Sequence, residues 1–190
     1  MAASDSPHSH NPTRTRRARH DCLSAAELTA RLEEEVGRAE RHHTALSCLL
    51  VSLDDVDRLA HVHGEDLPTK ALAYFGAALG PELRRFDRVG HAAEGELLVL
   101  LPGADERRGE IVARRALGRL HAIKIDVDGQ RRPLRISMGL AAWREGLTSE
   151  QLLSLTRLAA QRHDALQERQ SEPPREPNLD VGEMPGPRQS

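Results

Sequence analysis

The sequence predicts an α+β domain in which helices flank one central, mostly antiparallel sheet. Three observations lead to this fold class. Segments with helical periodicity alternate with short strand-like segments along the middle of the chain. The stretch 45–53 (ALSCLLVSL) is a continuous apolar run, which is typical of a strand buried on both faces. Two pairs of strand-like segments are joined by turn sequences, and such hairpins place neighbouring strands antiparallel.

Composition divides the chain of 190 residues into one domain and two tails. Residues 1–20 are polar, basic and proline-containing, and residues 171–190 are rich in proline and nearly devoid of large apolar side chains. Segments with so little apolar surface cannot offset the entropy lost on ordering, so both tails are predicted to be disordered. The single folded domain is therefore predicted to span residues 21–170.

The first half of this domain is predicted to contain three helices around the central strand. The sequence Ser24-Ala25-Ala26-Glu27 is a capping box, which marks the start of the first helix. After the strand, residues 55–63 form a short helix that ends at Gly64. A longer helix is predicted from Pro68, in its first turn, to Leu83, with leucine and phenylalanine at helical spacing.

A hairpin and a further helix are predicted next. The segments 86–92 and 96–101 flank a short acidic turn of small residues, which favours antiparallel pairing between them. Residues 105–120 have helical periodicity, and the side chains predicted to face the core are Ile111, Ala113, Leu117 and Leu120.

The last part of the domain is predicted to be a second hairpin followed by a helix. The segments 123–127 and 134–143 are predicted to pair across the Asp128-Gly129 turn, because Asp-Gly favours a tight hairpin. Thr148-Ser149-Glu150 then provides the capping residues of the last helix.

Charge and cysteine content narrow the functional classes. The net charge is only -2, so no bulk field draws the chain to nucleic acid or to a membrane surface. No stretch approaches the roughly 20 apolar residues of a membrane span, and the N-terminus has no apolar targeting segment. Cys22 and Cys48 lie in dissimilar settings, so a disulfide is not expected. We therefore expect a cytoplasmic protein that binds neither nucleic acid nor membrane.

Several segments, taken in order and at their spacing, resemble one known family. They are Asp21-Cys22-Leu23-Ser24, Ser52-Leu53-Asp54, Asp87-Arg88-Val89-Gly90, Leu98-Val99-Leu100-Leu101-Pro102 and Ile136-Ser137-Met138-Gly139-Leu140-Ala141. Together they make the chain from Asp21 to Leu166 similar to the GGDEF domain of diguanylate cyclases, which join two GTP molecules into cyclic di-GMP. The resemblance implies that family's fold, with a mostly antiparallel sheet flanked by helices.

The family's G-G-D/E-E-F signature aligns with Ala93-Glu94-Gly95-Glu96-Leu97, and little of it is retained. In the family the two glycines let the backbone approach the nucleotide phosphates, and here Ala93 and Glu94 replace them. The third position supplies a carboxylate to Mg²⁺, and Gly95 has none. Glu96 remains at the fourth position. Its metal-binding partner in the first strand, the leading Asp of the D-x-D motif, is Ser52.

The other substrate positions implied by the resemblance are also changed. The guanine-binding Asn aligns with Ala60, and the Gly-Asp pair of the next helix aligns with Pro68-Thr69. The phosphate-contacting Lys and Arg of the last helix align with Asp164 and Glu168, which reverses both charges. Because phosphoryl transfer depends on bound metal ions, we predict a domain that is not a cyclase and holds no metal or cofactor.

Two alternatives would preserve a metal site. A shift of the turn by one residue would present Glu94 to a cation, and Asp54 or Asp55 would replace the lost aspartate. Neither restores the guanine contacts, so an active cyclase is the least favoured hypothesis. Histidine-based zinc sites are not expected, because His42-His43 and His61-Val62-His63 lack the spacing and partner ligands of such sites.

One ligand-binding pattern of the family is retained. Many GGDEF domains carry R-x-x-D before the signature turn as a product-binding site, and Arg84-Arg85-Phe86-Asp87 occupies that position. The resemblance adds a further arginine, Arg115. An arginine fork bonds guanine O6 and N7 or a phosphate, and an aspartate accepts from guanine N1 and N2. The alternative is that Arg84 and Asp87 form only a surface ion pair at a helix end.

Two functions follow from this sequence. The first is a cyclic di-GMP receptor that binds through Arg84, Asp87 and Arg115 and signals through an unidentified protein partner. The alternative is a ligand-free protein-interaction or scaffold module with the GGDEF fold, which acts through its surface helices or as a homodimer.

Overall fold

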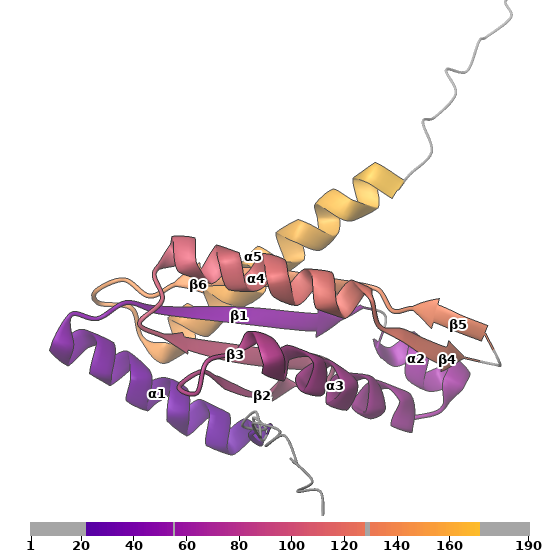
Figure 1. Cartoon of the computed structure of the whole chain (residues 1–190), viewed down its shortest axis with the longest axis horizontal. Helices are drawn as coiled ribbons and strands as arrows, with labels where there is room; N and C mark the ends of the chain where they lie inside the picture. Colours follow the sequence, from indigo (N-terminus) through magenta and orange to yellow (C-terminus); the bar gives the residue numbers. More distant parts are fainter. Residues whose placement is uncertain (1–21, 55, 128–129, 172–190) are drawn as a thin grey trace, which may run out of the picture.

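The structure is a computed structural model that describes residues 22–54, 56–127 and 130–171. Its central element is the strand β1 (Figure 1). The helices are α1 (Ala25–His42), α2 (Val56–His63), α3 (Asp66–Leu79), the 3₁₀ turn η1 (Gly80–Glu82), α4 (Glu106–His121) and α5 (Ser149–Ser171). The strands are β1 (Leu46–Leu53), β2 (Arg88–Ala93), β3 (Glu96–Pro102), β4 (Lys124–Val127), β5 (Gln130–Pro133) and β6 (Ile136–Ala142).

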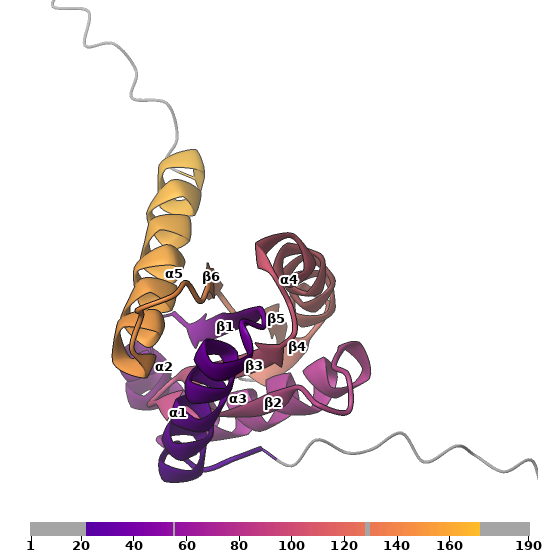
Figure 2. The same cartoon turned by 90° about the vertical axis from the view of Figure 1, so that its left-hand side faces the viewer.

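Four strands form the main sheet in the order β2-β3-β1-β6, and every neighbouring pair is antiparallel. Successive side chains of β1 point to opposite faces of the sheet, so they enter two different hydrophobic cores. Leu49, Val51 and Leu53 pack with apolar side chains of α3 and α4, whereas Cys48 and Leu50 pack with those of α1 and α5. Figure 2 shows α4 and α5 on opposite sides of the strands. The predicted α+β class with helices on a mostly antiparallel sheet is confirmed.

The buried environment of Cys48 makes its thiol inert. The residue is 0% exposed, and burial raises the pKa of Cys48 to about 12. Cys22 is exposed, and the two cysteines do not form a disulfide. Among the described residues, no helix has the combined length and apolarity needed to cross a bilayer.

The structure confirms the start of the first helix and corrects the end of the third. The Ser24 hydroxyl and Glu27 form the expected capping box, with the Ser24 amide donating to the Glu27 carboxylate at 2.9 Å. The long helix begins at Asp66 and ends at Leu79 instead of continuing to Leu83. Pro81 has no N–H with which to continue the α-helical hydrogen bonds, so the chain passes into η1.

Two predicted buried or strand positions are exposed. Ile111 was predicted to face the core but is 50% exposed, because α4 turns Gly109, Ala116 and Leu120 toward the sheet instead. The strand predicted from residue 86 begins at Arg88, since the preceding residues form a turn, and Phe86 is 67% exposed.

The predicted pairing of segment 123–127 with segment 134–143 was wrong. Residues 124–127 pair with β5, and the two form a separate two-stranded sheet. The Asp128-Gly129 turn lies outside the described residues. β6, which lies within the segment 134–143, pairs instead with β1. Leu53 lies opposite Ile136, and Ser47 lies opposite Ala142. This pairing covers the free edge of β1 and buries the first four residues of β6.

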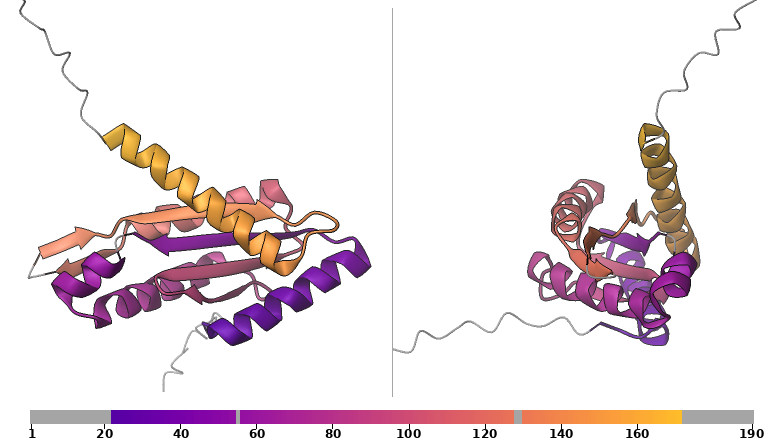
Figure 3. Two further views of the ribbon diagram at one scale, coloured as in Figure 1. Left: turned by 180° about the vertical axis from the view of Figure 1, so that it is seen from behind. Right: turned by 90° about the vertical axis from the view of Figure 1, so that its right-hand side faces the viewer.

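α5 crosses over β6 and β1, as Figure 3 shows from behind. The backbones of α5 and β6 approach each other closely at Gly139. A Cβ added to Gly139 would collide with the Thr156 carbonyl oxygen and the Ala160 amide nitrogen. Thr156 is fully buried, and its hydroxyl donates to the Leu152 carbonyl at 2.7 Å. Glycine in β6 therefore fixes how α5 lies on the sheet.

We predict that Gly139→Ala lowers the free energy of unfolding by about 1–3 kcal/mol, because the added methyl group overpacks the contact between β6 and α5. Urea denaturation of the full chain measures this change. Gly118→Ala is the matched control, since Gly118 lies inside α4 with open space around its Cα. There the same methyl group is expected to stabilise by about 0.5–1 kcal/mol. Equal effects of the two substitutions would contradict the packing argument.

Candidate functional site

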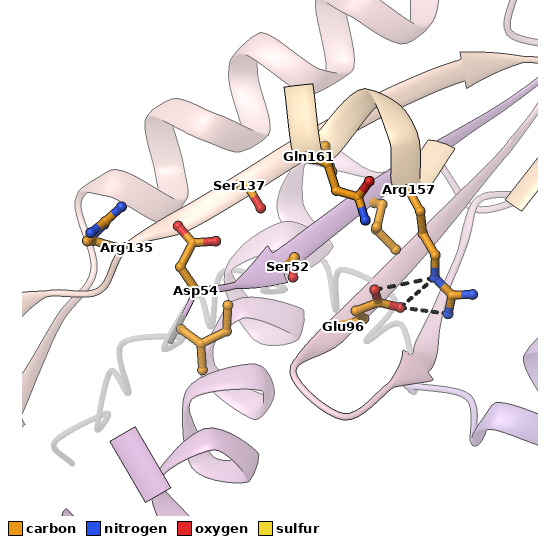
Figure 4. Close-up of a pocket in the computed structure, with 10 residues that line it drawn as sticks. Ser52, Asp54, Glu96, Arg135, Ser137, Arg157 and Gln161 are labelled. Atoms are coloured by element: carbon orange, nitrogen blue, oxygen red, sulfur yellow. Dashed lines mark hydrogen bonds and ion pairs between the residues drawn. The ribbon is translucent and has the colours of Figure 1, made fainter. Parts of the chain in front are cut away.

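A polar pocket of about 220 Å³ lies where the end of β1 meets β3, β6 and α5 (Figure 4). In the sheet, Ser52 lies opposite Glu96 on one side and opposite Ser137 on the other, so all three side chains share one face. α5 covers this face. The residues that line the pocket are Leu50, Ser52, Leu53, Asp54, Glu96, Arg135, Ser137, Arg157, Ala160 and Gln161.

The dominant interaction in this pocket is the ion pair between Glu96 and Arg157. Arg157 Nε lies 3.3 and 3.0 Å from the two carboxylate oxygens of Glu96, and Arg157 Nη2 lies 2.7 Å from Oε2. Nη2 also donates to the Ala92 carbonyl at 3.4 Å. The Glu96 side chain is 18% exposed and that of Arg157 is 36% exposed. A guanidinium thus neutralises the Glu96 carboxylate within the chain and ties the β2–β3 hairpin to α5.

Gly95, in the turn between β2 and β3, packs closely against the start of α2. Gly95 adopts a φ of 72°, is buried, and accepts a hydrogen bond from the Leu53 amide at 2.8 Å. A Cβ at this position would collide with Cγ2 of Val56, the first residue of α2. Glycine therefore suits both the backbone conformation and the space in this structure. In this structure, a side chain at the position that aligns with the family's metal-binding carboxylate would require Val56 to move.

The residues considered as substitute metal ligands do not gather around Glu96. Glu94 is exposed and is not among the residues that line the pocket. Asp54 does line it, at the end near Arg135, and Figure 4 shows its carboxylate away from the Glu96–Arg157 pair. Asp55 lies outside the described residues. Within the described residues, no group of three or more His, Cys, Asp or Glu side chains is arranged to hold a metal ion. The donor set does not fit the Mg²⁺ site that the family resemblance implies.

The other positions aligned with substrate contacts lie on three helices. Ala60 is half-buried in α2, Pro68 is buried in the first turn of α3, and Thr69 beside it is exposed. Asp164 and Glu168 fall within α5. None of the first three side chains carries an amide or a carboxylate with which to read a guanine base.

Arg84 and Asp87 belong to one tight turn between η1 and β2. The Arg84 amide donates to the Asp87 carboxylate at 2.6 Å, and the Asp87 amide donates back to the Arg84 carbonyl at 3.0 Å. Asp87 is 3% exposed, whereas Arg84 is exposed. The aspartate thus closes the turn from inside and presents the arginine side chain to solvent.

Arg115 reaches the same region through a contact with Glu82. Arg115 Nη2 lies 2.7 Å from Glu82 Oε2, and Arg119 Nε lies 2.8 Å from Glu82 Oε1. The hydrogen bond from Arg119, together with the nearby charges of both arginines, lowers the pKa of Glu82. Glu82 is the last residue of η1, two positions before Arg84. α4 and the R-x-x-D turn are thereby joined at one surface.

Sequence reasoning missed three of these residues. Arg157, Glu82 and Arg119 lie at positions to which the family resemblance assigned no role. The spacing of Arg115 and Arg119, four residues apart on a helix, was the available signal for a shared partner. Nothing in the sequence indicated which glutamate would pair with Arg157, 61 positions away from it along the chain.

The comparisons with known proteins identify the family. The family model described as "Diguanylate cyclase, GGDEF domain" matches residues 23–170. The chain therefore belongs to the GGDEF domain family. No curated protein matches the sequence.

Solved structures of GGDEF proteins share the fold. Diguanylate cyclase SiaD from Pseudomonas aeruginosa, solved with its activator SiaC, has a TM-score of 0.71 and 23% identity over 76% of this chain and 56% of that one. This chain thus spans just over half of that structure. The GGDEF domain of DgcB from Caulobacter crescentus, solved with c-di-GMP, has a TM-score of 0.70 and 10% identity over 78% and 88% of the two chains. The active GGEEF domain of a diguanylate cyclase from Vibrio cholerae has a TM-score of 0.68 and 14% identity over 77% and 93%.

We predict that Arg157→Ala lowers the free energy of unfolding by about 1–2 kcal/mol, because it leaves a partly buried carboxylate without its partner. Chemical denaturation at neutral pH measures the loss. The control is Arg162→Ala, which removes the same side chain from an exposed position of α5 and is expected to change stability by less than about 0.5 kcal/mol. A double-mutant cycle with Glu96→Gln isolates the pair, and additive effects would contradict it.

Proposed function

We propose that this GGDEF domain does not synthesise cyclic di-GMP and instead binds it, as a receptor that acts through a protein partner. The observation that carries the first half of this proposal is the ion pair between Arg157 and Glu96. It occupies the one acidic position of the signature turn that the sequence retains, and it uses both oxygens of that carboxylate.

Loss of synthesis follows from the charge balance of this pocket. Transfer of a nucleotidyl group needs cations that neutralise charge developing on the phosphates. The Glu96 carboxylate already has a guanidinium partner, and the opposing residue in β1 is Ser52, whose neutral hydroxyl is a weak ligand for a hard cation. An Mg²⁺ ion bound at Glu96 would have to displace Arg157, and the Asp54 carboxylate lies at the other end of the pocket.

Binding of the finished dinucleotide has different requirements. Cyclic di-GMP is a dianion with two guanine bases, and it can be held by arginines without any metal. Arg84 is exposed on a turn that Asp87 shapes, and the Arg115 side chain is 59% exposed on α4. In this proposal Arg84 bonds a guanine edge or a phosphate, and Arg115 neutralises a phosphate. Asp87 holds the turn through its buried carboxylate, and that carboxylate reaches the guanine N1 and N2 donors only if the turn opens.

The similar structures support both halves of the receptor proposal. The GGDEF domain of DgcB was solved in complex with c-di-GMP, so this fold accommodates the dinucleotide. SiaD was solved in complex with its activator SiaC, so a protein partner can bind a chain that contains this fold. The alternative of a ligand-free interaction module is favoured by the apolar side chains that α5 leaves exposed, Leu155 and Leu158 at 43% each.

We predict that the full chain binds cyclic di-GMP in isothermal titration calorimetry, and that Arg84→Ala weakens binding by about tenfold or more, because charge-assisted hydrogen bonds are lost. Arg85→Ala is the matched control, since Arg85 is an exposed neighbour in the same turn. Asp87→Ala is tested with an unfolding measurement alongside, because its carboxylate closes the turn. No heat with the wild-type chain would favour the interaction module.

We predict that incubation of the purified chain with GTP and Mg²⁺ yields no cyclic di-GMP, as measured by chromatography of the nucleotides. Restoring the aspartate alone, with Ser52→Asp, is expected to leave the chain inactive, because Arg157 still pairs with Glu96 and Gly95 supplies no ligand. An active cyclase assayed in parallel verifies the conditions. Product formed by the wild-type chain at a rate proportional to its concentration would overturn the proposal.

A further inference from the structure

A second basic feature lies beside the R-x-x-D turn and rests on three residues. Glu82, at the end of η1, accepts from Arg115 through one carboxylate oxygen and from Arg119 through the other. The two arginines are one helical turn apart on α4, and both contact the same carboxylate. The resemblance to the GGDEF family assigned a role to Arg115 but none to Arg119 or Glu82.

The Glu82 carboxylate is largely buried, and the two arginine side chains that contact it are exposed. The Glu82 side chain is only 6% exposed, whereas each arginine side chain is 59% exposed. The carboxylate therefore lies beneath two exposed guanidinium groups. Each arginine has five N–H donors and spends one nitrogen on Glu82, Nη2 for Arg115 and Nε for Arg119. Among the described residues, the contacts of each guanidinium to Glu82 leave its other two nitrogens for an external acceptor.

The charges of this group favour an anion. Two arginines and one ionised glutamate leave a net charge of +1, and the pKa of Glu82 is lowered, so the carboxylate stays ionised at neutral pH. Glu82 also keeps two long side chains side by side, which reduces the conformational entropy that they lose when they bind a ligand. Arg84 is exposed only two positions further along the chain.

We propose that Arg119 is a phosphate-binding residue of the dinucleotide site, paired with Arg115, and that Glu82 is the positioning residue that holds both arginines. The ligand class is a phosphodiester, whose two non-bridging oxygens match a pair of arginine forks. This inference rests on the proposed receptor function and extends it. Arg84, on the turn that Asp87 closes, binds one part of cyclic di-GMP, and the arginine pair binds a phosphate.

The test compares cyclic di-GMP binding to the full chain and to Arg119→Gln by calorimetry. The variant is expected to lose affinity by about tenfold, because a charge-assisted contact to phosphate is removed. Arg114→Gln is the matched control, since it removes the same charge from an adjacent exposed position of α4 that points to another side of the helix. Its affinity is expected to stay within about twofold of wild type.

The positioning role of Glu82 is tested by NMR of the arginine side chains. In the wild-type chain, cyclic di-GMP is expected to shift the Nε–Hε signal of Arg119. In Glu82→Gln that signal is expected to move toward the position of a solvated arginine, and affinity is expected to fall severalfold. Tighter binding by Glu82→Gln would show that Glu82 competes with the ligand, and would overturn the positioning role.

The outcomes separate this inference from the proposed function. If the wild-type chain binds cyclic di-GMP and Arg119→Gln binds it equally well, the arginine pair is overturned and the receptor function stands. If the wild-type chain does not bind cyclic di-GMP, the receptor function is overturned. Titration with inorganic pyrophosphate then tests the pair by itself. A shift of the Arg119 Nε–Hε signal that is lost in Arg115→Gln supports an anion site, and no shift overturns it.

Discussion

Burial of β1 on both faces and along both edges is the constraint from which the rest of the structure follows. Its side chains alternate between two apolar cores, so helices must cover both faces, and β3 and β6 must satisfy its two edges. The end of β1 is consequently surrounded by the β2–β3 turn, α2 and α5. This is why Ser52, Glu96 and Arg157, which are far apart in the sequence, line one pocket. The chemistry of that pocket is decided by which side chains the surrounding elements carry.

Local signals in the sequence were sufficient for elements whose partners are near in the chain. The Ser24–Glu27 capping box, the apolar run of β1 and the β2–β3 hairpin were all predictable, because propensity and tertiary packing agree there. The pairing of β6 was not, since an Asp-Gly turn favours its neighbour and says nothing about the free edge of β1. The family resemblance located Glu96 and the R-x-x-D turn, but an ion pair between distant residues such as Glu96 and Arg157 depends on helix placement, which one sequence does not encode locally.

The regions around Glu96 and Glu82 are built in the same way but differ in net charge. In each, a carboxylate from the sheet or its connecting turn accepts from arginines of a helix that follows later in the chain. At Glu96 one arginine meets one carboxylate, and the charges cancel inside a small pocket. At Glu82 two arginines meet one carboxylate, and an excess positive charge remains at the surface. The arginine fork suits both cases, because its planar donors can satisfy a carboxylate on one side and present nitrogens on the other.

The close seating of α5 on β6 has a mechanical consequence. The helix is held tightly where Gly139 admits the backbone at Thr156 and Ala160, and its last turns project past the edge of the sheet (Figure 1). From Ala160 to Ser171 the helix extends about 16 Å, at 1.5 Å per residue. A tilt of about 10° at the seat therefore displaces the far end by roughly 3 Å. A small change in how α5 is seated on β6 is therefore magnified along the length of the helix.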